Sequence, residues 1–443
     1  MSLSRRQLLQ AAGGVSLGVA ANQPLHRSRT MAQSGEKESV VIQFWTHDQN
    51  YIDFFTARAA ELTESPDSPY AYELNVTQAP TADLITKAVA AYSAGRGIPD
   101  AIGIEISQFS RFMQRGVAEQ TLLDLTDRVA DLRDQFFESR WAPYTVDGRV
   151  YAVESGYPLS VYYYRQDLLE EYGIGAPLET WDQVMEIGRE IVVPQGKAMA
   201  AISTTGGQGG GDITQFGLLF QQRGGNFFDA DGNLTLDTPE AVEVAEFLAT
   251  GLQEQTILGL TDFYGGPGAA AMQQGATVGY FMPDWFETYV LQPTVPDQEG
   301  LWRIQPLPAF AGGGSRTSVW GGTGFAVSRD SPAVEATWEL LRYGYLTRDG
   351  QIKRWQEIKY LPTMAEVWDD PALTGPDPFL GGQEAGQIYK ELAPTAPTQY
   401  QSPFWNQLTV ELAGQLAELY NGRTSPADAI KNAAAAVQQE MGS

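Results

Sequence analysis

Three tryptophans stand beside residues that open turns, outside any helical stripe of apolar residues. Trp285 follows Pro283-Asp284, Trp320 precedes Gly321-Gly322, and Trp405 opens the last helical segment. An indole at such a place can lie at a wet edge and stack on the apolar C–H face of a ligand. The two glycines lack side chains, so a ligand can approach the backbone beside them. The candidate binding residues of this group are Asp284, Trp285, Trp320, Gly321, Gly322 and Trp405.

Acidic and amide side chains follow two of the predicted strands. Asp48 and Gln49 come after the first strand, and Glu105 and Gln108 come after the third. Ligands of open α/β sheets lie at the carboxyl ends of the strands, and planar polar groups there bond hydroxyls. An alternative is that Asp48 only caps the following helix. The alternative for Glu105 and Gln108 is a solvated loop.

An alternation of strands and helices is needed to bring these candidate binding residues to one edge of a sheet. The apolar patterns predict strands over 40–45, 72–76 and 101–104 and helices over 53–64 and 81–94. This alternation is typical of βαβ units with a mostly parallel sheet.

Further elements are predicted along the rest of the chain. A helix begins at Trp181 with Thr180 as its N-cap, and a second covers 239–252 with Thr238 as its N-cap. A strand over 321–327, a helix over 333–345 and helical structure from Trp405 onward follow. No boundary separates two self-sufficient halves, so we expect two domains with interleaved segments.

The first 32 residues are predicted to be an export signal. Arg5-Arg6 precedes a weakly apolar stretch over 8–21, which is too short to span a membrane. The pair resembles the twin-arginine signal of proteins exported in the folded state. Cleavage is expected after Ala32, with a site near Ala21 as the alternative. We therefore expect a periplasmic or extracytoplasmic protein without stable membrane insertion.

The composition excludes several classes of function. The chain has 443 residues, a formal net charge of -25, no Cys and only two His. Without Cys there is no disulfide scaffold, thiol nucleophile or lipid-bearing cysteine, and one His after the signal makes a metal site less favoured. The excess of acidic over basic residues argues against binding of nucleic acid. We expect no cofactor and no metal ion. We expect the protein to be a monomer.

Two local patterns imitate other binding sites. Residues 229–240 resemble a calcium loop, but the glycine stands at 232 and Leu234 takes the sixth position, so a hairpin turn explains them better. The glycine-rich run over 206–211 lacks the Lys-Ser/Thr of a phosphate loop and predicts no nucleotide site.

The order of short motifs resembles the extracellular solute-binding proteins of family 1, the sugar-binding receptors of ABC importers. Gly97-Ile98-Pro99-Asp100 matches the family's motif before its third strand, and Thr180-Trp181-Asp182-Gln183 matches a helix start. Arg165 departs from the usual Asn. Further matching segments are 147–153, 163–168, 223–229, 237–241, 281–285, 306–308, 321–328 and 361–363.

This resemblance implies a two-lobe α/β periplasmic-binding-protein fold with interleaved domains joined by a hinge. Lobe one would comprise 37–153 and 308–356, and lobe two 158–303 and 360–443. A neutral sugar, oligosaccharide or sugar-like osmolyte would bind in the cleft and pass to the ABC permease subunits. Trp285 and Trp405 match the family's stacking tryptophans, and Tyr157 would bring its hydroxyl to the cleft or pack in the hinge.

Two other classes of function remain open at this level. One is a secreted carbohydrate-active enzyme that uses paired carboxylates such as Asp48 and Glu105. The other is a two-lobe receptor for a non-sugar small molecule, such as a metal or a charged compound.

Overall fold

A computed structural model describes residues 37–204 and 212–442. Residues from 38 onward form one compact unit. The predicted export signal and the glycine-rich run over 206–211 therefore lie outside the described residues. No helix within the described part is both long and apolar enough to cross a membrane.

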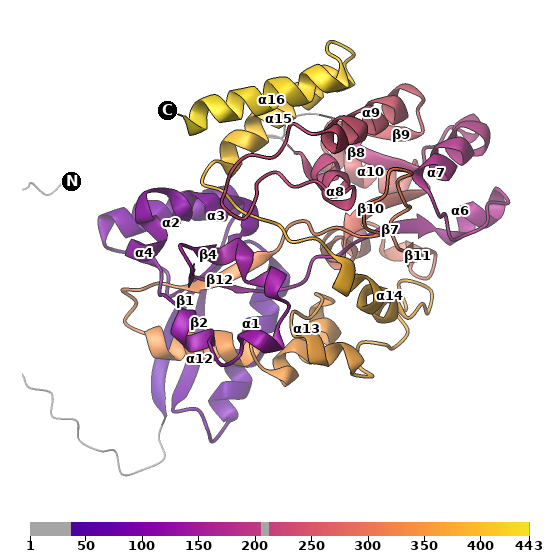
Figure 1. Cartoon of the computed structure of the whole chain (residues 1–443). Coiled ribbons are helices and arrows are strands. Elements are labelled where there is room, and N and C mark those ends of the chain that lie inside the picture. Colours follow the sequence, from indigo (N-terminus) through magenta and orange to yellow (C-terminus); the bar gives the residue numbers. More distant parts are fainter. Residues whose placement is uncertain (1–36, 205–211, 443) are drawn as a thin grey trace, which may run out of the picture. The chain divides into compact units, whose positions relative to one another are not determined.

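The first sheet has five strands in the order β2-β1-β3-β12-β6 (Figure 1). These are β2 (Tyr70–Gln78), β1 (Glu38–Thr46), β3 (Ala101–Glu105), β12 (Thr323–Val327) and β6 (Val153–Glu154). β1 runs parallel to β2 and β3, which confirms the predicted βαβ rhythm. β12 runs antiparallel to both of its neighbours, so it is reversed relative to β1, β2 and β3, and β6 beyond it runs in their direction again.

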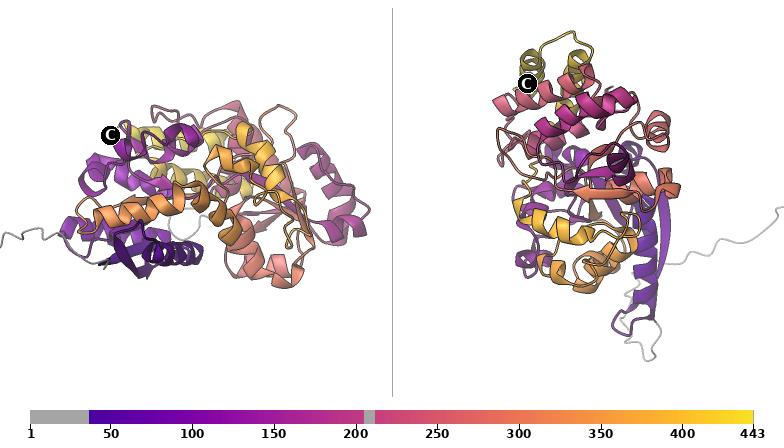
Figure 2. Two further views of the ribbon diagram at one scale, coloured as in Figure 1. Left: turned by 90° about the horizontal axis from the view of Figure 1, so that it is seen from below. Right: turned by 90° about the vertical axis from the view of Figure 1, so that its right-hand side faces the viewer.

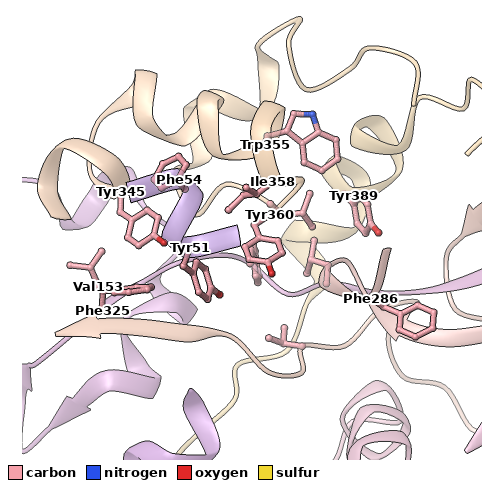
Figure 3. Packing of buried hydrophobic residues seen from close by; sticks show 14 of the residues in the cluster. Tyr51, Phe54, Val153, Phe286, Phe325, Tyr345, Trp355, Ile358, Tyr360 and Tyr389 are labelled. Carbon is pink, nitrogen blue, oxygen red and sulfur yellow. The ribbon is translucent and has the colours of Figure 1, made fainter. Parts of the chain in front are cut away.

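Helices α1 (Gln49–Glu64) and α12 (Val334–Tyr345) pack on this sheet and on each other. Helix α2 (Thr81–Ala94) spans the predicted residues and contacts β1 and β3. Helices α3 (Ile106–Met113) and α13 (Arg348–Ile358) complete this half. Their core is aromatic, as Figure 3 shows for Tyr51, Phe54, Phe325 and Tyr345. The rings of Phe54 and Tyr345 stack 5.6 Å apart.

The second sheet joins β7 (Ser160–Arg165) to β10 (Gly279–Pro283) and β11 (Trp302–Gln305). β7 is the central strand, and both pairings are antiparallel. A parallel pair, β8 (Ala200–Ser203) and β9 (Ile257–Leu260), lies in the same part of the chain. The second sheet therefore does not repeat the parallel order of the first.

Several helices pack around the second apolar core. α9 (Pro239–Gln253) contacts α8 (Thr214–Gln222), α15 (Trp405–Tyr420) and α16 (Pro426–Met441). The two C-terminal helices are yellow in Figures 1 and 2, and they pack on each other. The side chain of Thr238 accepts a bond from the N–H of Ala241, as its predicted N-cap role requires.

Two predicted boundaries shift for local reasons. The helix expected from 53 begins at Gln49, because the Asp48 carboxylate caps it by accepting the Asn50 N–H. The strand expected from 321 begins at Thr323, because Gly321 and Gly322 have φ values of +80° and +112°, which end an extended strand.

The remaining α-helices and strands in the described part of the chain are short and connect these layers. They are α4 (Val117–Thr121), α5 (Thr126–Val129), β4 (Thr145–Val146), β5 (Arg149–Val150), α6 (Gln166–Glu171), α7 (Trp181–Ile187), α10 (Gly266–Gln273), α11 (Gln292–Thr294) and α14 (Ala385–Leu392).

Candidate functional site

A cavity of about 460 Å³ lies where the carboxyl ends of β1, β3 and β10 meet. Eight of the eleven predicted site residues line it, although they come from distant parts of the chain. They are Asp48, Glu105, Asp284, Trp285, Trp320, Gly321, Gly322 and Trp405.

The other three predicted residues are placed elsewhere. Gln49 is exposed on α1 and donates to the Asp53 carboxylate over 2.8 Å. Gln108 donates to the hydroxyl of Ser107. Tyr157 is buried at the crossing between the sheets, where its hydroxyl donates to the carbonyl of Ala393 over 3.0 Å. This placement agrees with hinge packing, the alternative given for Tyr157.

Trp285 and Trp320 are half-buried, and their N–H groups are already bonded within the protein. Trp285 Nε1 donates to the Trp320 carbonyl over 2.9 Å, and Trp320 Nε1 donates to Thr214 Oγ1 over 3.1 Å. These bonds fix both indoles, so each offers a ring face and no polar donor to a ligand.

Trp405 differs from the other two tryptophans because it is only 2% exposed. Its ring packs against Phe227 at 5.6 Å and against Trp320 at 6.2 Å. Trp405 therefore lies at the edge of the cavity, and its main role is to pack against and support Trp320.

Gly321 and Gly322 line the cavity with backbone alone, because neither residue has a side chain. A Cβ on Gly322 would lie 2.5 Å from Glu154 Oε1, and one on Gly321 would lie 3.1 Å from Trp285 Nε1. Both positions also have positive φ values. Side chains are therefore excluded here by space and by backbone conformation.

Asp48 both caps α1 and faces the cavity, so its two interpretations are compatible. One carboxylate oxygen accepts the Asn50 N–H, and the other accepts the Tyr360 hydroxyl. Burial raises the pKa of Asp48, and the bond from Tyr360 opposes that rise. Figure 3 shows Tyr360 beside Tyr51, with ring centroids 5.4 Å apart.

Asp284 and Glu105 are carboxyl groups with free acceptor capacity. Asp284 Oδ2 accepts the Leu361 N–H over 3.0 Å, while Oδ1 is buried without a partner among the described residues. Glu105 Oε2 accepts the Ser107 N–H and caps α3. Burial raises the pKa of both carboxyls to about 7.

The sequence did not single out several polar and aromatic lining residues. His47 lies beside Asp48, and burial lowers its pKa to about 4, so its imidazole is neutral near pH 7. Asp212 offers Oδ2, which has no described partner. No motif marks these positions. The additional lining residues also include Tyr51, Thr81, Ser107, Ser155, Thr214, Tyr264, Tyr289, Tyr360 and Thr409.

The lining favours a ligand that carries hydroxyl donors. Four carboxyl groups, those of Asp48, Glu105, Asp212 and Asp284, contribute to it, and no Lys or Arg does among the described lining residues. Carboxyl oxygens accept hydrogen bonds from hydroxyls, and the described lining offers an anion no cationic partner, so a hydroxyl-rich neutral molecule fits and an anion does not. Within the described residues, no group of three or more His, Asp or Glu side chains could hold a metal ion.

Comparison with known proteins identifies the family that the sequence resembles. The sequence pattern of the family described as "Bacterial extracellular solute-binding protein" matches residues 51–351. The arabinooligosaccharide-binding protein of Halalkalibacterium halodurans is 30% identical over 410 residues, which are 90% of this chain and 89% of the relative. The lactose-binding protein of Rhizobium radiobacter is 25% identical and covers 91% of this chain and 92% of its own.

A solved structure shares the fold. The GacH receptor of Streptomyces glaucescens superposes with a TM-score of 0.74 over 91% of this chain and 98% of its own, at 18% identity. This likeness shows a common periplasmic-binding-protein fold. The family pattern and the curated relatives extend over most of the sequence, and the chain therefore belongs to the bacterial extracellular solute-binding protein family.

Proposed function

We propose that this protein is the substrate-binding component of an ABC importer and that it binds a neutral sugar or oligosaccharide in the cavity. The carrying observation is the pairing of two fixed indole faces, those of Trp285 and Trp320, with buried carboxylates that have free acceptor atoms. Apolar sugar faces stack on such rings, and sugar hydroxyls donate to such carboxylates.

Residues from both sheets would hold the ligand. Asp48 and Glu105 would accept hydrogen bonds from hydroxyls on the side of the first sheet. On the side of the second sheet, Asp284 would accept hydrogen bonds and Trp285 would stack on an apolar sugar face. The names of the arabinooligosaccharide- and lactose-binding relatives support a carbohydrate. A family of binding proteins has no catalytic role for paired carboxylates, so the glycosidase alternative is set aside.

The two lobes predicted from the sequence would close on the ligand by a hinge. The strands of the first sheet fall within 37–153 and 308–356, apart from the short crossing strand β6, which supports this division. Closure would bring the sugar into contact with both sets of residues and present the complex to the permease.

Export is the second part of the proposal. Arg5-Arg6 and the apolar stretch after it would direct the folded protein through the twin-arginine route to the outside of the cytoplasmic membrane. Replacement of both arginines by lysine should retain the protein in the cytoplasm of its host, as cell fractionation would reveal. Unchanged export would contradict the twin-arginine assignment and leave the binding assignment intact.

Ligand binding is tested by a thermal-shift screen of the purified protein followed by calorimetry. The panel contains neutral mono-, di- and trisaccharides, the matching uronic acids, and polyamines. A neutral saccharide should raise the unfolding midpoint, because a ligand of the native state stabilises it by mass action. A response to uronic acids or polyamines alone would contradict the proposal.

A further inference from the structure

Arg354 on α13 is a fully buried cation that does not line the cavity. Its exposed fraction is 0%. Arg354 Nη2 donates to Gln351 Oε1 over 2.6 Å and to the Leu361 carbonyl over 3.1 Å, while Nε and Nη1 have no hydrogen-bond partner among the described residues. A buried guanidinium costs much free energy unless a negative charge lies near it. The surroundings of Arg354 must therefore supply a counter-charge.

Two carboxyl groups act on Arg354 in the described part of the chain, those of Glu154 and Asp284. Glu154 is already paired, because its Oε1 lies 3.1 Å from Arg140 Nη1 and both side chains are at most 2% exposed. Asp284 is also buried, and its Oδ1 has no partner among the described residues. Asp284 is thus the carboxyl group left to balance the charge of Arg354.

The backbone of Leu361 connects the two groups. Its carbonyl accepts from Arg354, and its N–H donates to Asp284 Oδ2 over 3.0 Å. The same carbonyl accepts the N–H of Tyr157 over 3.1 Å at the crossing between the sheets. One residue therefore determines where Asp284 lies relative to Arg354.

Arg354 is itself held in place on two sides. Gln351 Oε1 accepts from Arg354 and also from the N–H of Thr363 over 2.8 Å. The guanidinium carbon lies 5.3 Å from the ring centroid of Tyr345, within the range of a cation–π contact. The cation is therefore fixed in the interior and does not reach solvent.

The electrostatic balance of the pair agrees with this geometry. Burial raises the pKa of Asp284 to about 7, and the N–H groups of Leu361 and Trp285, followed by Arg354, oppose that rise. Burial lowers the pKa of Arg354 to about 10, so the guanidinium keeps its charge at pH 7. Without this cation, Asp284 would hold its proton through the neutral range.

The other titratable groups around Asp284 do not replace Arg354. They are the carboxyls of Glu154 and Glu287 and the hydroxyls of Tyr163 and Tyr389. Burial raises the pKa of both tyrosines well above 10, so they are neutral. A charge on either carboxyl opposes a charge on Asp284.

We propose that Arg354 is a positioning residue of the cavity, which holds Asp284, through the backbone of Leu361, as an ionised acceptor for the ligand. Arg354 acts from outside the lining and does not touch the ligand. A protonated Asp284 would present a donor where the ligand's hydroxyl needs an acceptor. The assignment of Arg354 itself needs no ligand, and its consequence for affinity rests on the proposed carbohydrate function.

Carbon-13 NMR of the aspartate side-chain carboxyls tests the assignment without a ligand. Asp284→Asn identifies the resonance of Asp284. In the parent protein this carboxyl should be ionised at pH 8, and Arg354→Gln should raise its titration midpoint by about one pH unit or more. Arg354→Lys keeps the charge and should bring the midpoint back near that of the parent. An Asp284 that stays protonated up to pH 9 in the parent would overturn the proposal, whether or not the variants fold.

Arg348→Gln is the matched control, because it makes the same substitution on the same helix. Arg348 is exposed and pairs with Asp370, so its loss should leave the titration of Asp284 unchanged. If Arg354→Gln also leaves this titration unchanged, or if Arg354→Lys shifts it as far as Arg354→Gln does, the charge of Arg354 does not act on Asp284 and the proposal fails.

Calorimetry with lactose and arabinotriose extends the test to the cavity, and the names of the curated relatives supply these two probes. A midpoint raised by one unit lowers the ionised fraction of Asp284 at pH 7 from about one half to about one tenth. Arg354→Gln should therefore weaken binding of the active probe about fivefold at pH 7 and less than about twofold at pH 9, where Asp284 ionises in both proteins.

A double-mutant cycle separates this role from a structural one. In the Asp284→Asn background, Arg354→Gln should weaken binding no further, because the group through which it acts is gone. An equal loss at both pH values and in both backgrounds would overturn the proposal. If neither probe binds the parent protein, the result counts against the proposed function, and the titration of Asp284 still decides the role of Arg354.

Discussion

At the scale of a single residue, Trp285 should contribute binding energy and little stability. Its ring is half-buried at the cavity, and its N–H is satisfied by the Trp320 carbonyl. Trp285→Ala should weaken sugar binding by about 2 kcal/mol, as loss of a buried aromatic anchor does, while the fold is kept. Calorimetry against the saccharide found in the screen measures this loss. Unchanged affinity would place the ligand away from Trp285.

Trp405 provides the contrasting control. It is buried among Phe227, Phe228 and Trp320, so Trp405→Ala should lower the free energy of unfolding by about 3 kcal/mol. Chemical denaturation of both variants separates the two roles. If Trp285→Ala proved as destabilising as Trp405→Ala, Trp285 would be a core residue.

The sequence predicted most of the residues that gather at the cavity, because turn-flanked tryptophans and acids after strands are local signals. It did not predict Tyr264, Tyr289 or Asp212. Their place depends on how the two sheets meet, and nothing in their local sequence records that. Tyr157 is not among the lining residues, and its hydroxyl donates to a carbonyl 236 residues away in the sequence, a partner that its local sequence does not record.

At the scale of elements, the segment after α13 links the two sheets through adjacent residues. The Tyr360 hydroxyl donates to Asp48, which follows β1, and the Leu361 N–H donates to Asp284, which follows β10. Two cavity carboxylates on different sheets are thus held by one short stretch of backbone. This segment is a positioning device for the cavity and need not touch the ligand.

Removal of one of these bonds tests the link. Tyr360→Phe keeps the ring packing and deprives the buried Asp48 of a donor, so sugar affinity should fall by about 1 kcal/mol. The loss should be greater at pH 5 than at pH 7, because the pKa of Asp48 rises without the bond that lowers it. Calorimetry at both pH values measures this.

The matched control is Tyr343→Phe. The hydroxyl of Tyr343 donates to Glu61 over 2.9 Å, and neither residue lines the cavity. This variant should bind as the parent does at both pH values. An equal loss in the two variants would show a general effect of hydroxyl removal in place of a role for the Tyr360 bond.

The sequence predicted which segments form helices and strands more readily than it predicted which strands pair with each other. The caps at Thr180 and Thr238 are side-chain bonds over three residues, so local sequence determines them. The antiparallel order of β10, β7 and β11 joins strands more than a hundred residues apart. No periodicity within a single strand encodes such a partner.

At the scale of the whole molecule, several buried carboxyl groups tie stability to pH. Burial raises the pKa of Glu287 to about 8, and burial raises those of Glu154 and Asp284 to about 7. Between pH 5 and pH 8 the folded protein keeps protons that the unfolded chain releases. The free energy of unfolding should therefore fall as the pH rises through this range, although the protein is strongly acidic overall.

Glu287 isolates this effect because it lies outside the cavity lining. Its neighbours are Asp377 and Asp284, which raise its pKa, and Lys359 and Gln292, which lower it. Glu287→Gln removes the charge at similar volume. It should raise the free energy of unfolding by about 1 kcal/mol at pH 8, change it little at pH 5, and flatten the pH dependence. Urea denaturation at the two pH values measures how the free energy of unfolding changes with pH.

The control is Glu246→Gln, at an exposed position of α9, which should leave this pH dependence unchanged. A Glu287→Gln slope equal to that of the parent would show that Glu287 already ionises freely in the folded protein.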